Sequence, residues 1–235
     1  MSREPAGRPG AAGNADESGR YPASRASLLD ILAAVASMLS RGEPIDFDET
    51  LRLLGRAVGV DRVYLFESHV DPETGELLCS QRAEWADAAV SAEIDNPELQ
   101  GLPLDALGPR VGRLLRGGDV VALRVGELGP EERSFRAMLE SQGIRSFCLV
   151  PVSTDGELWG FVGFDDCHRP RVWDEDEVAV LRIVAAILGG EASRERMRAD
   201  LAAAAQQYRY VVDNVREVIF ECDVDGRLTF LSSGW

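Results

Sequence analysis

The chain has 235 residues, of which 45% are hydrophobic and 28% are charged, so it is long enough for one full-sized core and part of a second. Its net charge of -15 repels phosphate backbones and anionic lipid headgroups, and no cluster of lysine and arginine forms a local exception. These values exclude nucleic acids and membrane surfaces as expected partners.

The beginning of the chain differs in composition from the rest. Residues 1–26 are rich in glycine, alanine, proline, serine and charge, and they lack the apolar block of a signal peptide. We therefore predict a disordered head and a cytoplasmic protein without a membrane span. The cysteines show no close-paired spacing, so we interpret them as small buried hydrophobic residues: Cys79, Cys148, Cys167 and Cys222.

Two helices are predicted after the head. The first starts at Ser27 and precedes Gly42, because apolar residues recur there at helical spacing: Leu28, Ile31, Leu32, Val35 and Leu39. The second starts after Asp46, which with Glu49 three residues later has the pattern of a helix cap, and it ends at Gly59.

The middle of the chain alternates between strand and turn patterns. In order, we predict a strand, a turn, a returning strand, an irregular region with one short helix, and a strand: 60–69, 71–75, 76–85, 86–118 and 120–125. A helix over 130–142 follows, because Pro130 stands at its first position with two acids in the first turn.

The segment 145–166 predicts a hairpin of two buried strands around Asp155-Gly156. A long helix follows, started by Asp174 with Glu177 three residues later. This order of elements predicts an α+β fold with one central antiparallel sheet. The terminal helices should cover one face of the sheet. The irregular region and the 130–142 helix should roof the other face and enclose a ligand pocket.

The stretches RSFCLVPV, GELWGFVGFDD and RVWDEDEVAVLRIVAAIL, taken with this order of elements, resemble a GAF domain over residues 27–196. The stretch EWADAAVSAEIDNPELQGLPLD is similar to the corresponding part of GAF domains that precede PAS domains in bacterial sensor histidine kinases. The resemblance implies a GAF-like sheet and a role in sensing small molecules, without catalysis by this chain.

The end of the chain, 208–235, resembles the start of a PAS domain, and we expect the chain to be a fragment of a larger sensor. The helix 197–207 would link the two domains. From residue 180 to residue 211, apolar residues recur at alternating steps of three and four, as in a coiled coil, and only Gly190 and Arg194 interrupt this seam. The apolar positions are Val180, Ile183, Ile187, Met197, Leu201, Ala204, Tyr208 and Val211. This seam favours a homodimer through the terminal helices. The alternative is a core helix that runs into an alanine-rich linker.

No metal or cofactor is indicated by the sequence. The only histidines, His69 and His168, are far apart, and metal sites normally need more ligands in recognisable spacing. Cys167 and His168 are adjacent, as in some bilin-binding GAF photoreceptors, but they follow a strand instead of lying in a helical part of the pocket. Asp165 and Asp166 should point to opposite faces of their strand, with Arg169 or Arg171 as ion partners.

Five residues are our candidates for lining a ligand pocket: Arg82, Trp85, Glu127, Cys148 and Phe161. By strand alternation, Trp159 and Phe161 should share one face and Phe164 should take the other.

Three functional hypotheses follow. The first is a sensory GAF module that relays a small-molecule or state signal through a dimeric helix to a PAS domain and an output domain, which we expect to be a histidine kinase. The second is a dimerisation platform without a ligand, whose pocket is filled by its own rings. The third is a reductase of the methionine sulfoxide type, which would use the thiols of Cys79 or Cys148.

Overall fold

The computed structural model of this protein describes residues 29, 33, 46–214 and 220–231. The predicted head at 1–26 lies outside the described residues. So does the predicted first helix, apart from Leu29 and Ala33, which are helical.

Helix α2 (Phe47–Val58) has the caps that its sequence predicts. The Asp46 carboxylate accepts a hydrogen bond of 3.1 Å from the backbone N–H of Glu49, and Gly59 ends the helix in the left-handed region at φ 71°. The apolar face of the helix, which includes Leu51 and Leu54, is fully buried. Capping fixes where α2 starts and ends, and burial fixes the face that it turns to the sheet.

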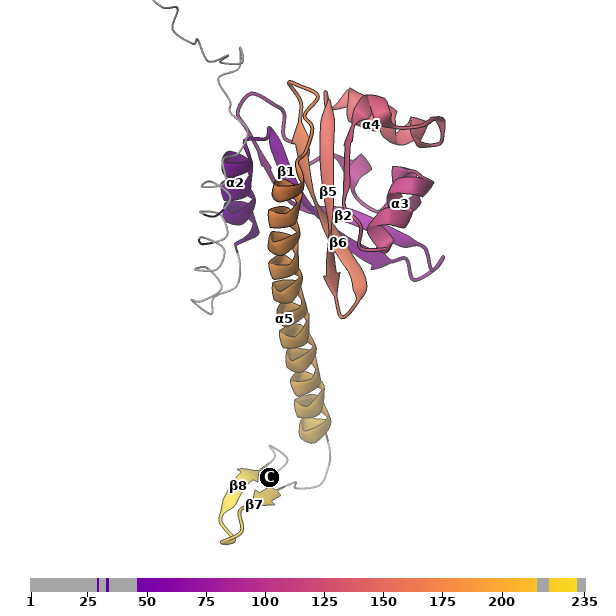
Figure 1. Cartoon of the computed structure of the whole chain (residues 1–235). Coiled ribbons are helices and arrows are strands. Elements are labelled where there is room, and N and C mark those ends of the chain that lie inside the picture. Colours follow the sequence, from indigo (N-terminus) through magenta and orange to yellow (C-terminus); the bar gives the residue numbers. More distant parts are fainter. Residues whose placement is uncertain (1–28, 30–32, 34–45, 215–219, 232–235) are drawn as a thin grey trace, which may run out of the picture.

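A six-stranded antiparallel sheet forms the centre of the molecule, in the order β3-β2-β1-β6-β5-β4 (Figure 1). Its strands are β1 (Arg62–Val70), β2 (Leu77–Ala86), β3 (Leu102–Pro103), β4 (Val121–Arg124), β5 (Ser146–Thr154) and β6 (Glu157–Asp166). Five of the strands match predicted segments. The two-residue β3, which pairs with β2, was not predicted because it is too short to show a pattern.

The hairpin β5–β6 turns at Asp155 and Gly156, which both have positive φ angles of 53° and 84°. This is the geometry that an Asp-Gly pair favours in a two-residue turn. Near the turn the pairing changes from Val152↔Gly160 to Ser153↔Leu158, so Trp159 is an extra residue in β6.

This bulge overturns one prediction about the rings of β6. Trp159 packs on the same core cluster as Phe164, whereas Phe161 belongs to the cluster on the other face. The prediction that Trp159 and Phe161 share a face was therefore wrong, because simple alternation breaks at a bulge.

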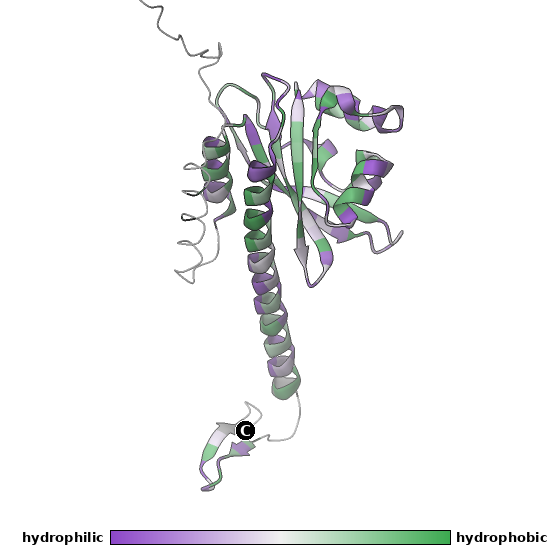
Figure 2. Cartoon of the chain, viewed as in Figure 1, coloured by the Kyte–Doolittle hydropathy of each residue, from purple (hydrophilic) through white to green (hydrophobic). Residues whose placement is uncertain are grey.

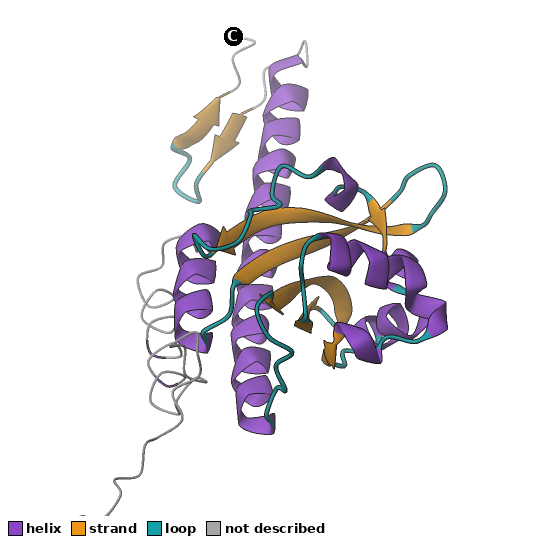
Figure 3. Ribbon diagram, turned by 90° about the horizontal axis from the view of Figure 1, so that it is seen from above, coloured by secondary structure: helices purple, strands orange, loops and turns teal. Residues whose placement is uncertain are grey.

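Helices α2 and α5 (Glu175–Asn214) cover one face of the sheet (Figure 3). The N-terminus of α5 is a reciprocal capping box: Asp174 accepts from the N–H of Glu177 at 2.7 Å, and Glu177 accepts from the N–H of Asp174 at 3.2 Å. The core on this face joins Leu181 and Leu188 of α5 to Leu54 and Val150.

The opposite face carries a roof of short helices, as predicted. They are η1 (Pro97–Leu99), η2 (Leu104–Leu107), α3 (Pro109–Arg116), η3 (Val125–Glu127), η4 (Pro130–Glu132) and α4 (Arg133–Ser141), where η marks a 3-10 helix. The predicted 130–142 helix is thus η4 followed by α4. Leu104, Val111 and Phe135 bring the roof onto the sheet in a second core cluster.

Helix α5 continues well beyond the sheet as a single helix of 40 residues (Figure 1). In Figure 2 its upper part is mostly hydrophobic and its lower part is mixed. Beyond its end lie β7 (Phe220–Cys222) and β8 (Leu228–Leu231), which form a hairpin around Gly226 at φ 80°. No described helix is both long enough and apolar enough to cross a membrane.

Candidate functional site

A small cavity lies between the sheet and the roof. Its volume is ≈ 30 Å³, which is room for about one water-sized group. Most of its wall is apolar and comes from both layers: Phe66, Leu99, Leu102, Leu107, Phe135, Met138, Leu139, Ile144, Leu149 and Phe161. The cavity is therefore nearly filled by the protein's own side chains.

Three aromatic rings on β1 and β6, in contact with one another, line the sheet side of the cavity. Phe66 stacks on Phe161 with ring centroids 4.9 Å apart, and Tyr64 meets Phe66 edge-on at 5.6 Å. Tyr64 can lie across β6 because its partner there is Gly163, where an added Cβ would come within 2.0 Å of the tyrosine ring. The glycine thus places the tyrosine hydroxyl at the polar end of the cavity.

The polar end is organised by Arg62 of β1, whose side chain is only 2% exposed. Its Nη1 donates to Oε1 of Gln142 at 3.0 Å, and its Nη2 donates to the backbone oxygen of Ser91 at 2.7 Å. Its Nε lies 3.2 Å from Oε1 of Glu84. One guanidinium therefore ties the sheet to two separate parts of the roof, the end of α4 and the loop before η1.

Glu84 of β2 holds the same loop from a second direction. Its Oε2 accepts hydrogen bonds from the backbone N–H groups of Glu93 and Ile94, at 2.7 and 2.8 Å. Burial raises the pKa of the Glu84 carboxyl above its ordinary value, against the lowering effects of these N–H groups and of Arg62.

Asp165, at the end of β6, is the second carboxylate beside Arg62. Tyr64 donates its hydroxyl to Oδ1 at 3.2 Å, and Oδ2 lies 3.8 Å from Nη1 of Arg62. Oδ2 has no hydrogen-bond donor among the described residues. Burial raises the pKa of Asp165 to about 7, although Arg62 and the Tyr64 hydroxyl oppose this.

Only one of the predicted lining residues, Phe161, lies in this cavity. Cys148 and Trp85 belong to the core on the opposite face. There the Trp85 ring packs on Gly55 so closely that an added Cβ on this glycine would lie 2.1 Å from the ring. Because side chains alternate along a strand, those of Cys148 and Trp85 both point toward α2 and α5 and away from the roof.

The two charged candidates lie on the surface instead of in this cavity. Arg82 pairs with Glu67 at 2.5 Å with its side chain 62% exposed. Glu127 caps η3 and pairs with Arg124 at 2.5 Å, also exposed. Arg82 of β2 is paired with a residue of the neighbouring strand β1, and Glu127 of η3 is paired with the last residue of β4.

Asp165 and Asp166 have separate partners, so they do not form a convergent pair of acids. Asp166 pairs with Arg169 at 3.1 Å and accepts from the loop N–H groups of His168 and Arg169. The predicted alternative partner, Arg171, pairs with Glu177 instead.

His168 pairs with buried Asp61 at 2.8 Å, and Cys167 beside it has its pKa raised to about 12 by burial. Among the described residues, no three side chains of the types that bind metals lie close enough together to hold an ion.

Sequence reasoning missed Arg62, Glu84 and Gln142. Arg62 had a usable signal, since it is a charged residue directly before the apolar run Val63–Phe66 of a predicted strand. A charged residue in a strand covered on both faces is rare unless it is paired. Its partners are 22 to 103 residues away along the chain, so they could not be named from spacing.

The sequence model of the GAF domain family matches residues 47–191, which are α2, the sheet, the roof and the first part of α5. The chain belongs to the GAF domain family. A curated relative is the methanogenesis regulatory histidine kinase FilI of Methanothrix harundinacea, which is 41% identical over 183 residues. That match covers 77% of this chain and 20% of the relative, so the chain spans about a fifth of the relative's length.

Solved GAF domains share the fold at low sequence identity. The phycocyanobilin-bound GAF domain of a cyanobacterial phytochrome is 17% identical, covers 73% of this chain and 96% of its own, and has a TM-score of 0.58. The chromophore-binding domain of the Stigmatella aurantiaca bacteriophytochrome is also 17% identical, covers 73% of this chain and 63% of its own, and has a TM-score of 0.51. This chain is thus a sensory module by its family, and the solved structures show that it shares their fold.

Proposed function

We propose that this chain is the sensory part of a longer cytoplasmic histidine kinase, and that α5 carries the state of the GAF cavity to a following PAS domain and the kinase output. The observation that carries the proposal is that α5 is fixed to the sheet at its start and leaves the domain as one continuous helix. The similarity to a regulatory histidine kinase supports the same role.

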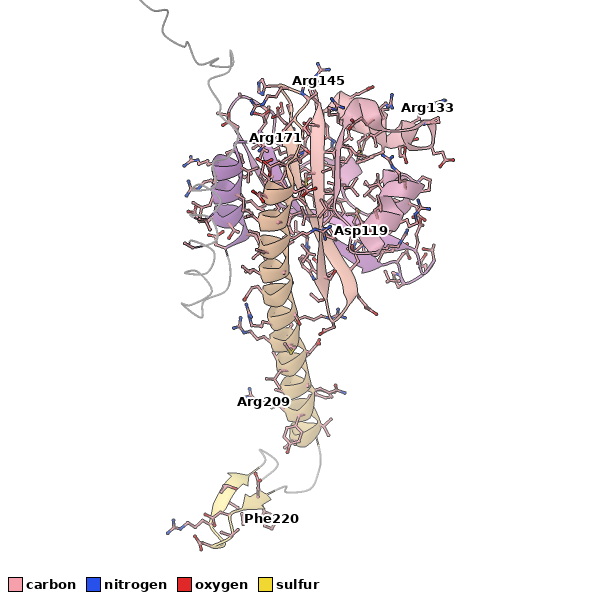
Figure 4. The ribbon with its side chains drawn as sticks, viewed as in Figure 1. Asp119, Arg133, Arg145, Arg171, Arg209 and Phe220 are labelled. Atoms are coloured by element: carbon pink, nitrogen blue, oxygen red, sulfur yellow. The ribbon has the colours of Figure 1, made fainter. Side chains whose placement is uncertain are left out.

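Arg171 joins the start of α5 to the end of α2. This side chain is 6% exposed, donates to the backbone oxygen of Val58 at 3.0 Å and pairs with Glu177 in the first turn of α5. Its guanidinium lies 4.5 Å from the ring of Trp173, which meets Phe164 edge-on at 6.2 Å. Figure 4 shows Arg171 at the sheet end of α5, far from Arg209 near the other end.

Phe164 directly precedes Asp165 in β6. Adjacent residues at the end of this strand therefore contact the segment before α5 and the polar end of the cavity. A change in how Arg62 and Asp165 are arranged would reach α5 through these contacts. Such a relay acts by shifting the populations of two arrangements, by no more than the signal's difference in affinity for them.

The outer part of α5 has the surface expected of a dimer interface. Several large seam residues are exposed in the single chain: Ile183, Met197, Leu201, Tyr208 and Val211. Leu201 is 73% exposed and Tyr208 is 62% exposed. Apolar side chains repeating along one helix in this way are usually covered by a second helix.

Multi-angle light scattering across a concentration series tests the dimer. We expect the 235-residue chain to be dimeric and Leu201→Glu to be monomeric, because a glutamate at a buried seam position leaves an unpaired charge. Ala203→Glu places the same side chain on the opposite side of the exposed helix and should leave the dimer intact. A wild-type chain that stays monomeric at high concentration would sink the proposal.

The platform without a ligand remains a second candidate, because the cavity holds only ≈ 30 Å³. The two candidates differ in whether the roof and the dimer are coupled. For a sensor, loosening the roof with Gln142→Leu should change the dimer dissociation constant measured by analytical ultracentrifugation. For a platform, the constant should stay the same.

The geometry does not favour the reductase. Cys79 and Cys148 lie in core clusters on opposite faces of the sheet, and burial raises the pKa of each thiol to about 12. At neutral pH both are thiols instead of the thiolates that redox chemistry needs.

A further inference from the structure

The guanidinium of Arg62 is placed between two competing acceptors. Its Nη1 donates to the neutral amide oxygen of Gln142 at 3.0 Å, and the same nitrogen lies 3.8 Å from Oδ2 of Asp165. A shift of less than one bond length would replace the first contact by the second. Both contacts have a charged donor, but an ionised Asp165 would add the attraction of an opposite charge in the interior, which the amide of Gln142 lacks.

Which acceptor wins depends on the charge of Asp165. Its side chain is fully buried, and its hydroxyl donor from Tyr64 serves only one of its two oxygens. An ionised carboxylate with so few donors is costly in the interior and draws the nearest cation, whereas a protonated one leaves the guanidinium to Gln142.

The groups around Asp165 determine the pH at which this exchange of acceptors takes place, and they place it near neutral. Arg62, Tyr64 and Asp61 face it from β1 and the residue before it, and Glu84 faces it from β2. Cys148 and Cys167 are close on β5 and after β6, and α4 contributes the neutral Gln142. The net result of burial against Arg62 is a pKa of about 7 for Asp165.

We propose that Arg62 and Asp165 form a proton-operated latch on the roof of the cavity. With Asp165 protonated, Arg62 holds Gln142 at the end of α4 and the roof is closed. With Asp165 ionised, the guanidinium turns to it and releases Gln142, so the end of α4 loosens. The latch rests on the proposed function, in which this cavity is the sensory site, and it makes access to the cavity depend on pH.

The consequence for the cavity follows from the position of Gln142. It is the C-cap of α4, whose residues Met138 and Leu139 line the cavity, and Ile144, two positions after Gln142, lines it as well. Glu84 keeps its bonds to Glu93 and Ile94 in both states, so the loop before η1 should stay attached. The opening is therefore expected at one side of the roof only.

Hydrogen–deuterium exchange measured by mass spectrometry on the 235-residue chain, at pH 6 and pH 8 and corrected for intrinsic rates, tests the latch. With a pKa of about 7 the ionised fraction rises from about one tenth to about nine tenths over this interval. We expect exchange in peptides covering 138–144 to increase by about tenfold, while peptides of β1 and β6 stay unchanged.

Two variants and a control make the outcome specific. Asp165→Asn keeps the shape of the protonated acid and should hold 138–144 closed at both pH values. Gln142→Leu removes the acceptor and should leave this segment open at both. Asp119→Asn, an exposed acid in the loop before β4, should behave as the wild type.

Equal corrected exchange of 138–144 at the two pH values in the wild type would overturn the latch, as would an unchanged pH response in Asp165→Asn. The exchange in β1 and β6 shows in the same data whether a variant is folded. Failure of the dimer test would remove the relay through α5 but would leave these exchange results standing, so the two proposals can fail separately.

Discussion

At the scale of single residues, the placement of Asp165 has a direct effect on stability. The unfolded pKa of this carboxyl is near the ordinary 3.8, and its folded pKa is about 7. Between these values the folded chain binds more protons than the unfolded chain, so the free energy of unfolding falls as the pH rises through this window. The buried acid therefore favours the folded state least above pH 7.

Asp165→Asn should remove this pH dependence. Relative to the variant, the wild type should lose about 2 to 3 kcal/mol of unfolding free energy between pH 5 and pH 8, because only the wild type must ionise a buried group. Urea unfolding of both proteins at several pH values measures the difference. Parallel stability curves for the two proteins would show that Asp165 does not titrate in this range.

At the scale of elements, two adjacent glycines in α5 have different roles. An added Cβ on Gly189 would lie 2.6 Å from the backbone oxygen of Ser153, so this glycine permits the close approach of α5 to β5. An added Cβ on Gly190 would meet nothing closer than 3.9 Å, at Arg194. The sequence marks Gly190, with Arg194, as an interruption of the apolar seam, yet the helix runs through both glycines without a break.

The substitutions Gly189→Ala and Gly190→Ala should therefore have opposite effects. Gly190→Ala should stabilise the chain by about 0.5 to 1 kcal/mol, because alanine has the higher helix propensity. Gly189→Ala should destabilise it by about 1 to 3 kcal/mol, because the helix must move away from β5. Thermal unfolding gives both values, and two changes of the same sign would contradict the assigned roles.

The elements that could be predicted are those whose signals are local. The cap at Asp46, the capping box at Asp174 and the Asp-Gly turn at 155–156 each depend on residues within a few positions. The Trp159 bulge could not be predicted, because it arises from the pairing of β6 with β5 and has no mark in the sequence of β6 alone.

The candidate site was the least predictable part for the same reason. Arg62, Glu84, Gln142 and Asp165 come from three strands and a helix end, and only the sheet order brings them together. The face of the sheet on which the cavity lies was predicted from the order of elements. Four of the five chosen lining residues lie elsewhere: Cys148 and Trp85 are in the core on the other face, and Arg82 and Glu127 form exposed ion pairs.

At the scale of the whole molecule, net charge governs how two copies meet. Each chain carries a net charge of -15, so a dimer brings two strongly acidic bodies together. Salt screens this repulsion over roughly 8 to 10 Å at physiological ionic strength and over a shorter distance above it. The apolar seam of α5 is not weakened by salt in the same way.

We therefore expect the proposed dimer to become tighter as sodium chloride is raised from 50 to 500 mM. Sedimentation equilibrium of the wild-type chain at each concentration measures the dissociation constant. Dissociation favoured by salt would point instead to an interface held by ion pairs.

The length of α5 gives small movements at its start a large reach. Forty residues at about 1.5 Å each make a rod of roughly 60 Å. A rotation of only about 1° at the Arg171 anchor would move the far end of such a rod sideways by about 1 Å, by the same helix geometry. The domain at the far end can thus be repositioned by a distance comparable to a change of hydrogen-bond partner while the cavity changes by far less than the width of an atom.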